Sequence, residues 1–215
     1  THTIAIQTLD TRTGVKSHKL YNELWVVDAS DEITDAQTYY MTAADLTAYK
    51  INNKDSKNAT DLINTRDGLN KLFADKQAEG YRKIVLLPGT YRINGEKTNR
   101  TPGNTDIFYI TIPSYFTVDM NGSTFKLNTI SVDNGTDTMA VGCLVRLDDA
   151  EDAHIINGTL EGDRFERKNL GLETDEASKK AKGEAINTLI FTGGKYCTAE
   201  NITIKNTTGD RKSVV

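Results

Sequence analysis

The sequence contains few cysteines, which can cross-link a small protein, and few prolines, which stiffen its backbone. It also has no long hydrophobic run. Among its 215 residues are only two cysteines, three prolines and one tryptophan. Two cysteines do not make a disulfide framework, so we expect Cys143 and Cys197 to be buried thiols. No apolar run approaches the roughly 20 residues of a membrane-spanning helix. We therefore expect no membrane partner and a fold held together by its core.

The chain also has no excess of basic residues. The chain carries 26 Lys and Arg against 30 Asp and Glu, a net charge of −4. Proteins that bind nucleic acid usually display a basic footprint, so we expect no nucleic-acid partner. Thr, Asn, Asp and Gly are abundant instead, and they separate short apolar runs. That composition is typical of many short strands joined by turns.

Three stretches of the chain resemble one another. The central one, Ala150–Arg164, reads AEDAHIINGTLEGDR, and related text occurs in Ser114–Leu127 and Ala199–Asp210. Self-similarity at spacings of tens of residues is the signature of a solenoid. Segments too short to bury a face alone must stack on their neighbours, which predicts an elongated β-solenoid.

The repeats also predict a register. Aligning Val118 with Ile155, and Ile155 with Ile204, gives spacings of roughly 37 and 49 residues, so the repeat length varies. Eight apolar side chains are expected to point inward and to stack: Val118, Phe125, Leu127, Leu147, Ile155, Leu160, Ile202 and Ile204.

The region before the repeats divides into two parts. Residues 1–53 do not follow the repeat and are predicted to be a small attachment element, whereas residues 54–215 form the solenoid domain. Ala59–Glu79 has helical apolar spacing and ends at Gly80, so it predicts an amphipathic helix that covers the open solenoid end. Because the chain stops directly after a repeat, we expect its C-terminal end to be truncated.

The segment Arg82–Ile93 (RKIVLLPGTYRI) points to a family. A helix, a strand, a Pro-Gly-Thr-Tyr turn and a second strand resemble the start of the pectate-lyase-like right-handed parallel β-helix proteins, which include phage tail proteins and tailspikes. The resemblance covers about residues 60–210. It implies an all-β, single-stranded right-handed parallel β-helix with an N-terminal capping helix and a small N-terminal appendage.

The resemblance also implies a site. Some family members read Gly-Asp-Arg, then Gly-His-Gly-Ile, then Gly-Asp-Gly-Ile on successive coils. This chain has Gly162-Asp163-Arg164, then Gly183-Glu184-Ala185-Ile186 with Glu in place of His, then Gly209-Asp210. The implied catalytic residues are Asp163, Arg164, Glu184 and Asp210. Four charged residues at and just beyond the same strand end are expected to bind substrate: Glu161, Glu166, Arg167 and Lys168.

Two kinds of chemistry suit these residues. Paired carboxylates astride a sugar linkage suit glycoside hydrolysis, whereas a carboxylate beside an Arg suits lyase chemistry, with the carboxylate as base and the cation stabilising charge. The missing His weakens any mechanism that needs an imidazole base. The same residues also fit a non-catalytic role in which an Asp–Arg pair holds a turn.

A second acidic group raises the question of a metal. Asp148, Asp149, Glu151 and Asp152 place four carboxylates in five residues, which fits either a Ca²⁺ site or an ordinary acidic turn. The three histidines show no metal-ligand spacing. We expect no cofactor, with Ca²⁺ as the alternative.

Three functions remain open from the sequence. The first is a polysaccharide-processing or polysaccharide-binding protein, such as a phage or prophage tail component acting on cell-surface glycan. The second is a non-catalytic fibre or adhesin, and the third is a secreted pectate-type lyase. All three imply an extracellular or virion-associated protein, a polysaccharide partner for the enzymes, and a homotrimer as one assembly for a rod.

Overall fold

The computed structural model of the chain describes residues 2–6, 20–24, 33–93, 109–128, 142–169 and 186–207. The chain divides into two compact units, Thr1–Thr34 and Asp35–Val215. In the first unit, β1 (His2–Ile6) and β2 (Leu20–Leu24) form an antiparallel pair in which His2 lies opposite Leu24. The predicted role of residues 1–53 as an attachment element stays a prediction.

The second unit is built mainly from short strands, with its longer helices before them. Its elements in order are η2 (Asp35–Gln37), β3 (Thr38–Tyr40), α1 (Ala43–Ala48), α2 (Ala59–Ala78), β4 (Lys83–Val85), β5 (Thr90–Ile93), β6 (Ile110–Thr111), β7 (Thr117–Asp119), β8 (Thr124–Leu127), β9 (Gly142–Asp148), β10 (His154–Glu161), α3 (Arg164–Asn169), β11 (Ile186–Thr192) and β12 (Thr198–Lys205). In the described part of the chain, no helix is both long and apolar enough to span a membrane.

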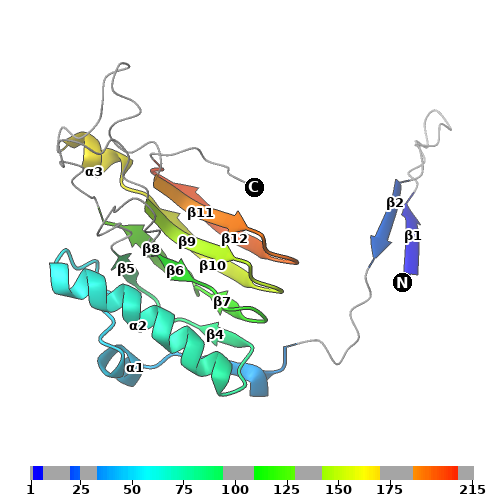
Figure 1. The fold of residues 1–215 in the computed structure, drawn as a ribbon, viewed down its shortest axis with the longest axis horizontal. Helices are drawn as coiled ribbons and strands as arrows, with labels where there is room; N and C mark the ends of the chain where they lie inside the picture. The colour runs from blue at the N-terminus through cyan, green and yellow to red at the C-terminus, as the bar shows by residue number, and fades with distance from the viewer. Residues whose placement is uncertain are drawn as a thin grey trace, which may run out of the picture. The chain divides into compact units, whose positions relative to one another are not determined.

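A seven-stranded parallel sheet runs through this unit (Figure 1). Its order is β3-β4-β7-β10-β8-β5, and β12 pairs with β10 as well. β10 is long enough to serve two partners, because its first half pairs with β7 and its second half with β8. Between these halves Asn157 has a positive φ of 59°, and Asn121 between β7 and β8 has a φ of 49°. Asn tolerates this left-handed conformation, so the chain bends there and the sheet curls.

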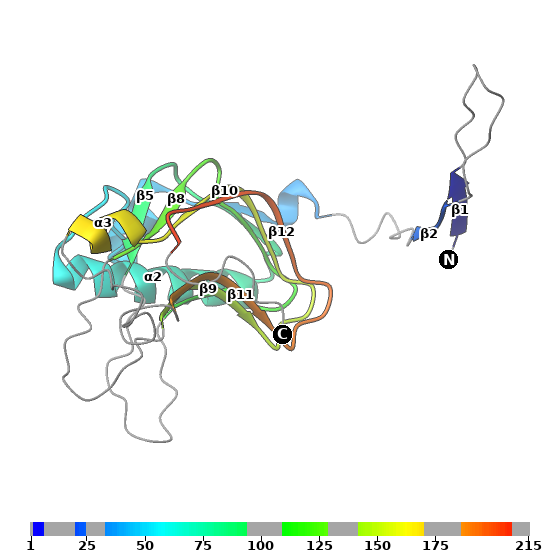
Figure 2. The same cartoon turned by 90° about the horizontal axis from the view of Figure 1, so that it is seen from above.

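A second parallel sheet has the order β11-β9-β6. Figure 2 shows its strands β9 and β11 across from β10 and β12 of the first sheet. The curled sheets together form a half-barrel, and α2 packs against β4 and β5 of one sheet and β6 of the other. The predicted all-β right-handed parallel β-helix is therefore wrong: the fold is mixed α/β, with a curled parallel sheet. The reason is that a 20-residue helix shares its core with the strands, instead of strands stacking only on strands.

Local signals explain α2. The Asn58 side chain accepts hydrogen bonds from the backbone N–H groups of Thr60 and Asp61, so it caps the first turn. Gly80 follows the helix with a φ of 95°, a conformation that glycine adopts without strain. The helix predicted over Ala59–Glu79 is thus confirmed as α2, but its assigned role as the cap of a β-helix falls with that fold. Leu72 and Phe73 are fully buried, and the Phe73 ring lies 6.3 Å from that of Phe116 on the sheet side.

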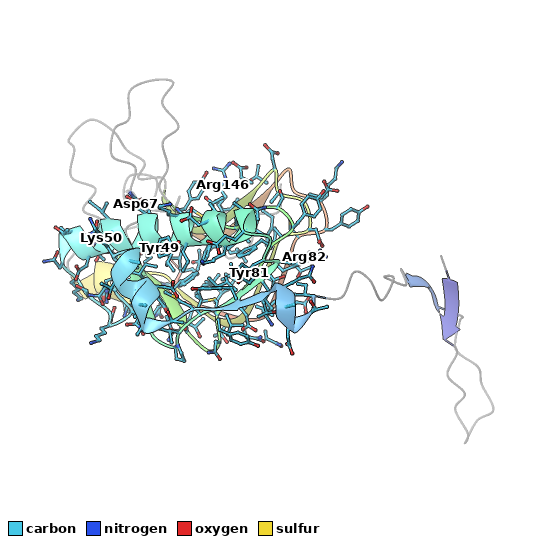
Figure 3. The ribbon with its side chains drawn as sticks, turned by 90° about the horizontal axis from the view of Figure 1, so that it is seen from below. Tyr49, Lys50, Asp67, Tyr81, Arg82 and Arg146 are labelled. Carbon is cyan, nitrogen blue, oxygen red and sulfur yellow. The ribbon has the colours of Figure 1, made fainter. Side chains whose placement is uncertain are left out.

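The helix α1 lies close to α2 (Figure 3). A methyl group at Gly68 of α2 would collide with the Tyr49 carbonyl group, so only glycine permits this approach. The two helices leave a shallow pocket lined by Tyr49, Lys71 and Asp75, among others. Lys71 lies 2.7 Å from Asp75, to which the Tyr49 hydroxyl also donates a hydrogen bond. These three polar groups of the pocket are therefore bonded to one another.

The core confirms most of the predicted inward side chains. Six are buried, namely Val118, Phe125, Leu127, Leu147, Ile155 and Leu160. Ile202 is half-buried and Ile204 is 41% exposed, because β12 is the last described strand on its side of β10. The predicted pairing of Val118 with Ile155 is confirmed. The third repeat is shifted from the prediction, since Ile155 pairs with Ala199 and Ile204 pairs with Leu160.

Candidate functional site

Two groups of polar side chains lie at opposite ends of β10, and the first contains residues that the sequence predicts. Arg92, Lys126 and Glu161 occupy paired positions on β5, β8 and β10. Because side chains alternate along a strand, these three point away from the core that their neighbours Tyr91, Phe125 and Leu160 fill. The pairing places their charges side by side across three strands.

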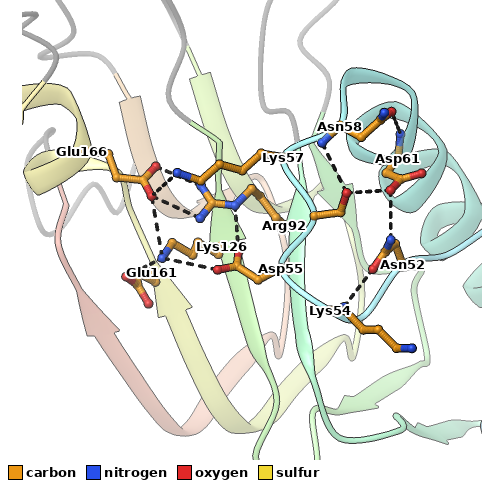
Figure 4. A network of polar contacts seen from close by, with 11 residues as sticks. Asn52, Lys54, Asp55, Lys57, Asn58, Asp61, Arg92, Lys126, Glu161 and Glu166 are labelled. Atoms are coloured by element: carbon orange, nitrogen blue, oxygen red, sulfur yellow. Dashed lines mark hydrogen bonds and ion pairs between the residues drawn. The ribbon is translucent and has the colours of Figure 1, made fainter.

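These charges form a closed network around Arg92 (Figure 4). The Arg92 Nε atom donates to Asp55 over 2.7 Å, and its two terminal nitrogens donate to Glu166 of α3 over 2.9 and 3.1 Å. Lys126 lies 3.3 Å from Glu161 and 3.9 Å from Glu166. Arg92 is only 2% exposed. We call Asp55, Arg92, Lys126, Glu161 and Glu166 the Arg92 network.

The electrostatics at Glu161 argue against a role for this residue as a general acid. Burial disfavours the charged form of Glu161, but hydrogen bonds from Lys205 and Lys126 and their positive charges outweigh it, so the pKa of Glu161 is lowered. A general acid near neutral pH needs a raised pKa. The Arg92 network is therefore best explained as the set of contacts that holds α3 and the segment around Asp55 against the sheet.

The other predicted site residues lie at or beyond the end of β10. Asp163 is 1% exposed and interacts within the protein, so contact with a substrate would require the adjacent chain to move. Arg164 begins α3, is exposed, and its backbone N–H donates to the Asn206 carbonyl over 2.9 Å. Arg167 and Lys168 also belong to α3, whereas Glu184 and Asp210 lie outside the described residues.

The structure thus brings two predicted residues, Glu161 and Glu166, together around Lys126. The catalytic roles of Asp163, Arg164, Glu184 and Asp210, like the four substrate-binding roles, stay predictions. Sequence reasoning missed Arg92, the centre of the network, because it lies 74 residues from Glu166 and sits within a strand pattern.

The acidic run between β9 and β10 spreads over several partners. Asp148 accepts a hydrogen bond from Arg146 over 3.0 Å, and Asp152 is bonded to Arg82 and His154. Among the described residues, no group of three or more His, Cys, Asp and Glu side chains could hold a metal ion. The Ca²⁺ alternative therefore gains no support from this run.

The second group of side chains lies where the chain enters β7, β10 and β12. Thr117, His154 and Thr198 begin these strands and are paired with one another. Two residues earlier, the chain has Tyr115, Asp152 and Tyr196 at matching positions. Backbone hydrogen bonds from Tyr115 N–H to Glu151 O (2.7 Å) and from Asp152 N–H to Lys195 O (2.9 Å) carry the pairing through this bend.

All three bend residues adopt the left-handed conformation. Their φ values are 56° for Tyr115, 52° for Asp152 and 58° for Tyr196. Tyr115 and Tyr196 are 50% and 74% exposed, so their rings stand out into solvent on either side of Asp152. Neighbouring strands lie about 4.8 Å apart, which places the two tyrosine backbones about 10 Å apart across β10. We call Tyr115, Glu151, Asp152 and Tyr196 the tyrosine surface.

A hydrogen-bonded chain runs beside the tyrosine surface. Asp152 contacts the Arg82 guanidinium over 3.3 Å, and its other oxygen lies 3.0 Å from His154 Nε2. The His154 Nδ1 atom lies 2.9 Å from the Thr198 hydroxyl, which donates to Glu200 over 3.1 Å. Arg82 is labelled in Figure 3, just before β4. These contacts fix the orientation of the Asp152 carboxylate.

The tyrosine surface was not predicted from the sequence, because an aromatic residue just before a strand is usually expected to be a buried core residue. A usable signal exists, since SYFT at 114–117 and KYCT at 195–198 match once the third repeat is shifted to its observed pairing. The predicted alignment used the apolar residues of β12 and so hid this match.

Comparisons with known proteins identify no family for this chain. No family model matches the sequence, and no curated protein is similar to it. A crystal structure from Parabacteroides merdae, described as a "putative glycosyl hydrolase", is similar with a TM-score of 0.42 and 13% sequence identity. The alignment covers 81% of this chain and 77% of that one. Similarity at this level defines neither a shared family nor a shared activity.

Proposed function

We propose that this protein binds a polysaccharide and that the tyrosine surface is its binding site. The observation that carries the proposal is the pair of exposed rings, Tyr115 and Tyr196, held in register on either side of Asp152. A sugar ring presents an apolar C–H face, which packs on an aromatic ring, and hydroxyl groups around its edge. Tyrosine offers an apolar face with a polar tip, and a carboxylate accepts hydrogen bonds from hydroxyl groups.

The backbone at these bends supports the proposal. A bulky side chain at positive φ is a conformational outlier, costing about 1–2 kcal/mol, and such outliers cluster at ligand-binding positions. At the next bend the same strands use Asn121, Asn157 and Asn201, with φ between 49° and 59°. Asn suits this conformation better than Tyr does. Neither tyrosine gains burial in return, so a ligand that covers the rings is the simplest source of compensation.

We propose binding without turnover at this surface. The carboxylates of the Arg92 network are neutralised by cations, and Asp163 is buried. The setting we propose is extracellular or virion-associated, where a protein meets cell-surface glycan. A phage or prophage tail component would fit this proposal, and so would a non-catalytic adhesin.

The test is a binding titration against a panel of bacterial and plant polysaccharides, by calorimetry or affinity electrophoresis. Tyr115→Asn and Tyr196→Asn remove each ring while keeping a residue that tolerates the bend. We expect each variant to weaken binding about tenfold or more without lowering the melting temperature. Phe165→Ala is the matched control, because it removes an exposed ring from α3, beyond the other end of β10.

Two results would overturn the proposal in different ways. If no polysaccharide binds, the function is wrong and a structural fibre becomes the better explanation. If a polysaccharide binds equally well to the wild type and to both tyrosine variants, the function stands but the site is wrong.

A further inference from the structure

We infer that the tyrosine surface selects neutral, hydroxyl-rich glycans over polyuronates, and that the glycan chain lies across the strands rather than along them. This inference rests on the proposed function and adds the chemical class and the direction of the ligand. It separates the protein from a pectate-type lyase, whose substrate is a polyuronate.

The direction follows from the strand pairing. Tyr115 precedes β7, Tyr196 precedes β12, and both strands pair with β10. A line from one ring to the other therefore crosses β10 at right angles to its course. A ligand that stacks on both rings must span about 10 Å, twice the strand spacing. A single sugar ring is too short for that, so the ligand is an oligosaccharide that passes over Asp152.

The groups under such a ligand are mainly hydrogen-bond acceptors. The exposed Glu151 carboxylate lies beside Tyr115, and its hydrogen bond raises the pKa of the Tyr115 phenol. The single phenol O–H is thus engaged with Glu151, so Tyr115 presents its ring face and an acceptor oxygen to the ligand. Asp152 offers a carboxylate whose orientation is fixed by Arg82 and His154. Ionised carboxylates only accept hydrogen bonds, so they match ligand hydroxyl groups, which donate.

The charge at the surface decides between glycan classes. Three carboxylates lie in this region, those of Glu151, Asp152 and Glu200, against two cations, Arg82 and Lys195. Arg82 and Asp152 are paired with each other, which leaves Glu151 and Glu200 against Lys195. A uronate carboxylate placed between the rings would approach the exposed Glu151, and like charges brought together disfavour binding. A neutral glycan meets no such repulsion, so it is favoured.

The repulsion must also depend on salt. Glu151 is exposed, and charges at an exposed surface are screened when the Debye length falls from about 30 Å at 0.01 M salt to about 3 Å at 1 M. The preference for neutral glycans should therefore be largest in dilute buffer. A preference set by shape alone would not change with salt.

The experiment compares matched probes. Neutral linear glucan and mannan oligosaccharides are titrated alongside the same oligosaccharides after oxidation of their C6 hydroxyl groups to carboxylates. We expect the oxidised form of any bound oligosaccharide to bind at least about tenfold more weakly at about 0.01 M salt, with the gap narrowing at high salt. Glu151→Gln should reduce the difference in affinity between the neutral and the oxidised oligosaccharide at low salt. Asp67→Asn, an equal charge change on α2, should leave it unchanged (Figure 3).

The outcomes are distinguishable. If an oxidised oligosaccharide binds as well as its neutral parent, and binding still needs Tyr115 and Tyr196, the inference about charge is wrong and the proposed function stands. If Asp67→Asn narrows the gap as much as Glu151→Gln, net charge explains the preference and the site assignment is wrong. If neither probe nor any polysaccharide binds, the proposed function itself fails.

Discussion

Replacing Arg92 by Met tests whether the Arg92 network stabilises the fold as its geometry indicates. The substitution removes one hydrogen bond to Asp55 and two to Glu166 while keeping a long side chain in place. Removing one partner of a fully buried ion pair destabilises by about 3–5 kcal/mol. Asp55 and Glu166 are themselves partly exposed, so water can solvate the two carboxylates that remain. We therefore expect a loss of about 2–3 kcal/mol in the free energy of unfolding.

The assay is thermal and urea unfolding followed by circular dichroism. For a unit of this size, each 1 kcal/mol shifts the melting temperature by about 2–4 °C, so the expected decrease is about 4–12 °C. Lys71→Met is the control, because it breaks an exposed pair with Asp75 on α2. Such pairs contribute about 0–1 kcal/mol, so its melting temperature should change little.

A double-mutant cycle locates the effect. Arg92→Met combined with Glu166→Gln should lose less than the sum of the two single losses, with a coupling free energy of at least about 1 kcal/mol. If Arg92→Met lowers stability no more than Lys71→Met does, or if the cycle is additive, the network does not hold α3 against the sheet and the reasoning fails.

Three further predictions concern pH, the thiols and the core. Burial disfavours the charged forms of Asp119 and Glu161, but hydrogen bonds from Lys83 to Asp119, and from Lys205 and Lys126 to Glu161, outweigh it and lower both pKa values in the folded protein. The resulting stabilisation is complete above the unfolded-state pKa values of about 4, and it is lost as the pH falls through the lower folded-state values. The acid unfolding of Asp119→Asn should therefore be less steep than that of the wild type. Cys143 is buried, which raises the pKa of its thiol to about 12, so a thiol reagent should modify Cys197 in the native protein and both cysteines only after unfolding. Ile155→Asp places a carboxylate at a fully buried position and should lower stability by several kcal/mol, and an unchanged melting curve would show that the assigned core is wrong.

The sequence predicts those parts of the fold that local patterns determine. The helix α2 follows from apolar spacing and the glycine at its end, and β5 follows from the alternation in TYRI, where Tyr91 and Ile93 are buried. These signals lie within one element. Short-range geometry alone therefore suffices to place them.

The fold class required contacts that no local pattern encodes. The prediction placed α2 outside a core made only of strands, whereas Leu69, Leu72 and Phe73 pack into the same core as the strands. The alignment predicted for the third repeat was wrong for a related reason. The chain has two apolar pairs five residues apart, Cys197 with Ala199 and Ile202 with Ile204, and either pair can be aligned with Ala153 and Ile155. Only the observed pairing of Ile155 with Ala199 decides between these alignments.

The site shows the same division. Glu161 and Glu166 were predicted as binding residues from their place after a strand, and they do lie together. Arg92 could not be predicted, because its partners Asp55 and Glu166 lie 37 and 74 residues away along the chain. The binding roles predicted for this charged run stay predictions, and in the described residues Glu161 and Glu166 are paired with cations from β5, β8 and β12.

The two rows of bends in this sheet show how a scaffold and a surface can be distinguished by residue type. Asn121, Asn157 and Asn201 form one row: the Asn157 amide donates to Asp119 over 3.1 Å, and Asn201 donates to Asn157 over the same distance. Those side chains return hydrogen bonds to the bend that they occupy. Tyr115 and Tyr196 form the other row with the same backbone conformation, but their rings are exposed, and burial cannot offset a strain of about 1–2 kcal/mol per residue. The asparagine side chains stabilise the bends that they occupy. The tyrosine side chains face outward, so a ligand that covers their rings can offset the strain of the bend.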